Sequence, residues 1–130
     1  MKTKQIKPLQ KATNGPANYP YVRINPKMLM INSKAMALWG DTDYMRISIS
    51  TDEQILIFSK AYEGDENAFK LSTVCETRRA RRIETNRALL AIIKAGFPLY
   101  MIDKRLPVKI LMDGSLAVDF SMKIPIKEAV

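Results

Sequence analysis

Residues 31–45 read INSKAMALWGDTDYM, and residues 83–101 read IETNRALLAIIKAGFPLYM. Both stretches begin at an isoleucine, continue into an apolar run, reach a glycine, and arrive at Tyr-Met four residues after it. The apolar run of the second stretch is longer by four residues, which is about one helical turn. Because glycine often follows the last residue of a helix, both stretches predict a helix that ends at the glycine.

Alternating apolar residues and turn signals predict short strands around the two helices. Met28–Ile31 is a further apolar run before the first helix, and Asp113-Gly114 is a hairpin signal. The strands expected from these patterns are residues 21–24, 44–50, 54–60, 68–72, 99–102, 108–112 and 116–122.

Each half of the sequence therefore has the order strand, helix, strand, strand. Neither unit can bury its helix alone, so the two units should pack together. We expect an α+β fold of two pseudo-repeated strand–helix–hairpin units, with a mostly antiparallel sheet and two main helices. Residues 19–130 form a single domain in this interpretation, with similar halves at about 19–72 and 73–124.

Residues 1–18 contain four lysines and few apolar side chains, which predicts a flexible basic arm. Such an arm is either an accessory to nucleic-acid binding or a solvated tail, and the sequence favours neither.

Arg78-Arg79-Ala80-Arg81-Arg82 and Arg87 place five arginines within ten residues. A single helix over residues 73–95 would put three of these arginines on its apolar stripe, and burying them there is untenable. We therefore predict that the arginine segment is a loop, a short strand or a separate first turn. The second helix then begins after Thr85, which caps it, and ends at Gly96; Ser33 caps the first helix over 34–39. The residues that the second helix and its end should bury are Leu89, Leu90, Ile92, Ile93 and Phe97.

Most methionines occupy positions expected to face the core, where this flexible side chain fills gaps. An adaptable protein-binding surface is the alternative for these methionines. Tyr44 and Tyr100 are expected in the core, whereas Tyr19, Tyr21 and Tyr62 are candidates for stacking on bases. The core-phase methionines are Met28, Met30, Met36, Met45, Met101, Met112 and Met122.

The chain has 21 Lys and Arg residues against 13 Asp and Glu, a net charge of +8. This surplus favours an anionic partner such as nucleic acid, an acidic protein face or a lipid surface. The sequence has no histidine, and Cys75 is the only cysteine, so we expect no enzyme, cofactor or metal site. Cys75 beside Val74 is interpreted as a small buried apolar residue. The acidic residues fall in separate predicted turns without the spacing of a calcium loop.

The longest apolar run, residues 88–93, is too short to span a bilayer, and no signal peptide is visible. We therefore expect no membrane association. A single free thiol favours the reducing cytoplasm.

The segment from Ile31 to Asp41, the strand beginning Tyr44-Met45-Arg46-Ile47 and the return strand at residues 55–57 resemble the swapped-hairpin regulators typified by AbrB and MazE. The resemblance implies a short helix, a Gly-Asp turn and two strands. It also implies a homodimer that binds DNA through basic residues on paired hairpins, to which Lys34 and Arg46 would correspond. This chain departs from that pattern at Ser33, where the family has proline, and its second unit lacks the lysine and the Gly-Asp pair.

Two functions from different classes fit these features. The first is a nucleic-acid-binding protein, a small transcription regulator, whose arginine cluster contacts phosphate. The second is an inhibitor or adaptor encoded by a phage or other mobile element, which binds a host nucleic-acid-handling protein. A third interpretation of the cluster is a solvated basic turn, or a set of arginines paired with Glu76 and Glu84. The candidate nucleic-acid-binding residues are Arg78, Arg79, Arg81, Arg82, Arg87, Lys94, Lys104, Arg105, Lys34 and Arg46.

Overall fold

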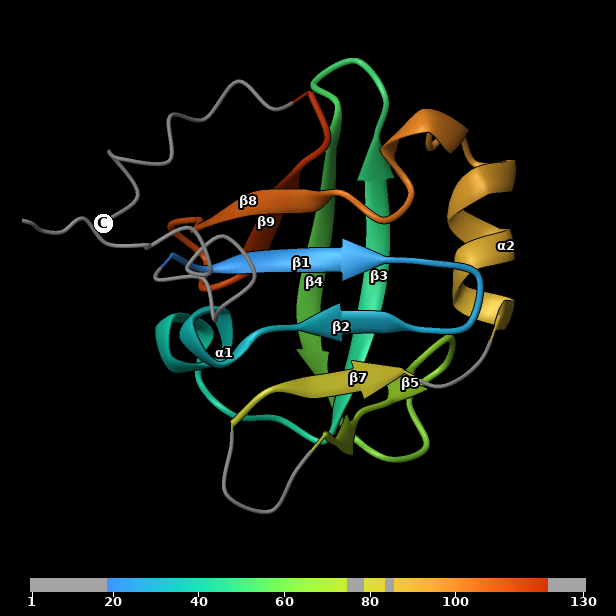
Figure 1. Cartoon of the computed structure of the whole chain (residues 1–130). Coiled ribbons are helices and arrows are strands. Elements are labelled where there is room, and N and C mark those ends of the chain that lie inside the picture. The colour runs from blue at the N-terminus through green and yellow to red at the C-terminus, as the bar shows by residue number, and fades with distance from the viewer. Residues whose placement is uncertain (1–18, 75–78, 84–85, 122–130) are drawn as a thin grey trace, which may run out of the picture.

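A computed structural model of the chain describes residues 19–74, 79–83 and 86–121 (Figure 1). Within these described residues, two α-helices and a short 3-10 helix accompany one large sheet. The elements are β1 (Tyr21–Ile24), β2 (Leu29–Ile31), α1 (Ser33–Trp39), β3 (Tyr44–Ser50), β4 (Ile55–Ala61), β5 (Phe69–Lys70), β6 (Ser72–Thr73), β7 (Arg81–Ile83), α2 (Asn86–Lys94), η3 (Leu99–Met101), β8 (Arg105–Ile110) and β9 (Leu116–Asp119).

The nine strands follow the order β5-β3-β4-β9-β8-β1-β2-β7-β6, and the pairings between them are antiparallel. The outermost strands of this order, β5 and β6, are separated in the chain only by Leu71, so the sheet curls back on itself into a near-closed barrel. In Figure 1, β8, β1, β2 and β7 form a front layer that runs across β3 and β4 behind it, with α2 at one side.

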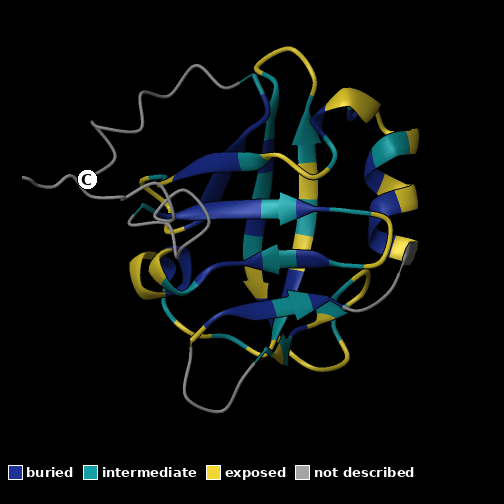
Figure 2. Cartoon of the chain, in the orientation of Figure 1, coloured by how far each residue is buried: buried dark blue, intermediate teal, exposed yellow. Residues whose placement is uncertain are grey.

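The core lies between these layers and contains the inward-facing residue of each strand. Phe58 and Trp39 pack with ring centroids 6.4 Å apart, and Phe97 meets Phe120 edge-on at 5.2 Å. Figure 2 shows buried residues along the strands of both layers and exposed turns between them. Fully buried strand residues include Val22, Ile24, Leu29, Ile31, Met45, Leu56, Phe58, Ile83, Leu106, Val108, Leu116, Ala117 and Val118.

The coarse fold prediction is confirmed, because the described part of the chain is a mostly antiparallel sheet with two α-helices. The break before the second helix is also correct. Arg81–Ile83 is a short strand, and α2 begins at Asn86. Asp113-Gly114 forms the β8–β9 turn, where Ser115 N donates to Asp113 Oδ1 at 2.9 Å and lowers the pKa of that carboxyl.

Asn32, rather than Ser33, caps the first helix. Its Oδ1 accepts hydrogen bonds from Ala35 N at 2.9 Å and from Tyr21 N at 3.0 Å, and its Nδ2 donates to Tyr19 O. The side chain is therefore buried but satisfied, and it ties the start of α1 to the start of β1.

Residues 99–102 do not form the expected strand. Met101 N bonds Pro98 O and Ile102 N bonds Leu99 O, which makes a 3-10 turn at η3. The chain must reverse between α2 and β8, and a tight turn does this in fewer residues than a strand. The strand after it is Arg105–Ile110 rather than residues 108–112.

Three predicted core residues are exposed in the structure. Tyr100 is 68% exposed on η3 because the expected strand is a turn, and Leu90 is 59% exposed on the outer side of α2. Met112 lies in the β8–β9 turn and is fully exposed. Met36, Met45 and Met101 are buried as predicted; Met28 and Met30 are half-buried. Met122, Cys75 and the basic arm lie outside the described residues.

No helix within the described part of the chain is long and apolar enough to cross a membrane.

Candidate functional site

Arg81 is a buried ion-pairing residue, with 7% of its side chain exposed. Its Nη1 bonds Asp41 Oδ1 at 2.7 Å, and its Nη2 bonds Asp43 Oδ1 at 2.8 Å and Leu71 O at 2.9 Å. These are short charge-assisted bonds from one planar guanidinium. They join β7 to the turn after α1 and to the chain between β5 and β6.

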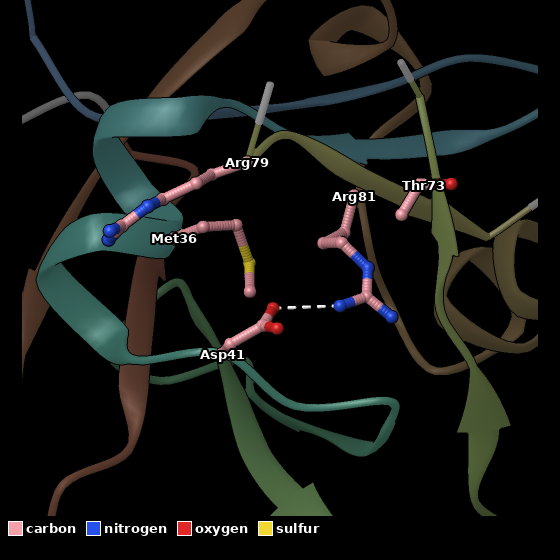
Figure 3. Close-up of a pocket in the computed structure, with 5 residues that line it drawn as sticks. All are labelled: Met36, Asp41, Thr73, Arg79 and Arg81. Atoms are coloured by element: carbon pink, nitrogen blue, oxygen red, sulfur yellow. Dashed lines mark hydrogen bonds and ion pairs between the residues drawn. The ribbon is translucent and has the colours of Figure 1, made fainter. Parts of the chain in front are cut away.

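The surroundings of Arg81 form a pocket of about 340 Å³, lined also by Met36, Thr73 and Arg79 (Figure 3). The view shows the Asp41 carboxylate turned toward the Arg81 guanidinium, whereas the exposed Arg79 side chain extends over α1. Two carboxylates already neutralise Arg81, so this side chain has a structural role instead of the phosphate contact expected from the sequence. Its partners are Asp41 and Asp43; Glu76 and Glu84, the partners considered from sequence, lie outside the described residues.

Arg82 has the opposite orientation from Arg81, because successive side chains of a strand alternate between faces. Arg81 and Ile83 are buried, which leaves Arg82 on the outer face of the barrel. The same alternation applies to β1, where Val22 and Ile24 face the core and Arg23 faces outward.

The registers of the front-layer strands bring these outward residues into one row. Arg105 on β8 pairs with Arg23 on β1, Arg23 pairs with Met30 on β2, and Met30 pairs with Arg82 on β7. Ser72 on β6 continues the line beside Arg82. We call Arg105, Arg23 and Arg82 the arginine row. Because neighbouring strands lie about 4.8 Å apart, the row spans about 14 Å from β8 to β7.

The contacts of Arg105 and Arg23 hold these two side chains in place without neutralising them fully. The Arg105 guanidinium carbon lies 5.0 Å from the Tyr21 ring centroid, a cation–π contact over a ring that is itself buried. Arg23 Nε lies 3.8 Å from Asp103 Oδ1, too far for a hydrogen bond. All three arginines of the row are half-buried, so their stems pack on the sheet.

The remaining candidates do not belong to this row. Lys104 is the exposed neighbour of Arg105, and Lys34 is exposed on α1. Arg46 on β3 lies 3.9 Å from Asp65. Arg87 and Lys94 lie on α2, and Arg78 lies outside the described residues.

Sequence reasoning found two members of the row, Arg82 and Arg105, and missed Arg23. The alternation of Tyr-Val-Arg-Ile could have placed Arg23 on the outer face. Arg82 and Arg105 lie 59 and 82 positions after Arg23 in the chain. The strand registers that align them with Arg23 leave no local signal in the sequence.

Acidic residues do not build a metal site in the described ranges, where no group of three or more His, Cys, Asp and Glu could hold an ion. Comparison of the chain with models of protein families, with curated proteins and with solved structures finds no match.

Proposed function

We propose that this protein binds nucleic acid and contacts its phosphates through the arginine row. The observation that carries the proposal is the direct pairing of Arg105, Arg23, Met30 and Arg82 across four adjacent strands. Arg105 and Arg23 lie directly opposite each other, and like charges in that position on a sheet face are unfavourable by themselves. An anion on that face removes the repulsion, and the guanidinium fork suits phosphate geometry.

The shape of the row favours a chain of phosphates over a single small anion. Three arginines in a line of about 14 Å are too far apart for one phosphate to contact them all. A nucleic-acid backbone presents negative charges at regular spacing along a line. The net charge of +8 adds a long-range attraction toward such a polymer.

A pull-down from cell extract, with and without nuclease, tests this proposal against the alternative of a protein-directed inhibitor or adaptor. We expect the immobilised protein to retain nucleic acid from untreated extract at low salt, and co-captured proteins to be lost after nuclease treatment. Capture of one protein at equal yield after nuclease treatment, with no nucleic acid in the untreated eluate, would favour the protein-directed function instead.

We also infer that the chain is a duplication of one strand–helix–hairpin unit. Only Leu71 separates β5 from β6, and these two strands together take the place of β1 in the second unit. On that basis the pairings repeat in kind: β1 with β2 corresponds to β6 with β7, β3 with β4 to β8 with β9, and β1 with β8 to β5 with β3. The other two pairings, β2 with β7 and β4 with β9, join corresponding strands. When Ile31 is aligned with Ile83, Met30 is aligned with Arg82. These two equivalent residues pair directly across β2 and β7, which is the pairing expected where a local twofold axis relates the two strands.

Such a duplication supplies two units in one chain, so the homodimer that the resemblance to swapped-hairpin regulators implied is not needed. We therefore expect light scattering coupled to gel filtration to give a mass near 14.8 kDa at micromolar concentration. A stable species of twice this mass would contradict this inference and leave phosphate binding by the row untouched.

A further inference from the structure

Asp103 is anchored beside the arginine row by its backbone. It lies in the turn between η3 and β8, and its N–H donates to Ile24 O at the end of β1, at 2.7 Å. This bond fixes the Asp103 backbone beside the end of β1, so the carboxylate stays within reach of Arg23. Its φ of 70° is a left-handed conformation that Asp and Asn tolerate better than most residues.

The contact between Asp103 and Arg23 is loose. The Nε–Oδ1 distance is 3.8 Å, and the two side chains are 43% and 56% exposed for Arg23 and Asp103. Water screens such a pair, so an incoming anion can replace the carboxylate at small cost. The Arg81 pairs are the opposite case, with distances of 2.7 and 2.8 Å around a guanidinium that is almost fully buried.

A pocket of about 360 Å³ adjoins Asp103 and gives an incoming phosphate room. The β1–β2 turn forms its other walls, including Lys27. Asn25 Oδ1 accepts hydrogen bonds from Lys27 N and Met28 N, both at 2.9 Å, and so fixes the shape of this turn before any ligand arrives.

We propose that Asp103 sets the affinity and selectivity of the arginine row. In the free protein, the Asp103 carboxylate contacts Arg23. A phosphate of the ligand displaces this carboxylate from Arg23 and enters the pocket beside Lys27. This proposal rests on the proposed function. A single small anion contacts one arginine and gains little from the exchange. A polymer that also contacts Arg82 and Arg105 gains enough to displace the carboxylate, so Asp103 selects for extended phosphate chains.

Fluorescence anisotropy with a labelled 20-base-pair DNA duplex tests the exchange, using Asp103→Asn. Asparagine keeps the tolerance for positive φ and removes the charge that competes with phosphate. We expect binding about three- to fivefold tighter at 50 mM salt, and a dependence of log affinity on log salt steeper by up to about 0.9. A thermal melt of each protein checks that the fold is retained.

Asp52→Asn is the matched control, because Asp52 is exposed in the β3–β4 turn and loses the same charge. We expect Asp52→Asn to raise the affinity for the duplex less than Asp103→Asn does. In an Arg23→Gln background, Asp103→Asn should raise the affinity by no more than this control does. An equal gain from both Asp→Asn variants, or a gain from Asp103→Asn that persists without Arg23, would overturn the exchange while the row still binds DNA. Failure of the wild-type protein to bind the duplex at all would overturn the proposed function, and the exchange with it.

Discussion

Replacing both Asp41 and Asp43 with asparagine will lower the free energy of unfolding by about 2 to 4 kcal/mol. The reason is that Arg81, with 7% of its side chain exposed, then carries a buried charge without a counter-ion. Asparagine can still accept a hydrogen bond from Arg81, and Leu71 O still accepts one from Nη2. The variant therefore keeps these hydrogen bonds and loses the two negative charges. Urea denaturation followed by circular dichroism measures the change.

Two comparisons separate this effect from a general change of charge. Asp52→Asn should shift the stability by less than about 0.5 kcal/mol, as is usual at exposed positions. Arg81→Met should cost less than the double asparagine variant, because the two carboxylates that it leaves are 76% exposed and remain solvated. A double variant as stable as the wild type would show that these two ion pairs do not stabilise the fold.

Local sequence patterns predicted the main elements of the fold. Alternation located Tyr44–Ser50 with its correct bounds, and the impossibility of burying three arginines on one helix located the start of α2 correctly. The tight turn at Leu99–Met101 was missed because its apolar residues have the composition of a strand. Its conformation depends on the path from α2 to β8, which is a long-range constraint.

The candidate site was only partly predictable, and Arg81 and Arg82 show why. Adjacent arginines in a strand must face opposite sides, but the side that each faces depends on which neighbours are buried. The partners of Arg81 lie 38 and 40 residues earlier in the chain, and Arg23 joins the row only through the registers of β1 with β8 and β2. Neither relation has a local sequence signal.

Changing the arginine row to glutamine will weaken duplex binding much more than the same loss of charge elsewhere. Glutamine keeps part of each aliphatic stem, which packs on the sheet, and removes the charge from Arg23, Arg82 and Arg105. At about 1 kcal/mol for each lost phosphate contact, we expect affinity to fall about 100-fold at low salt. The control is a second triple variant with equal charge loss outside the row, Lys34→Gln, Arg46→Gln and Lys94→Gln.

The salt dependence of binding by these two variants is the most direct measurement of the central claim that the arginine row contacts phosphate. Each phosphate that a side chain neutralises contributes about 0.9 to the slope of log affinity against log salt. We predict that the row variant lowers the magnitude of the wild-type slope by about 2 to 3, with a thermal melt close to that of the wild type, and that the control variant changes it by less than about 1. Equal slopes for the row variant and the wild type, with both proteins folded, would contradict the claim.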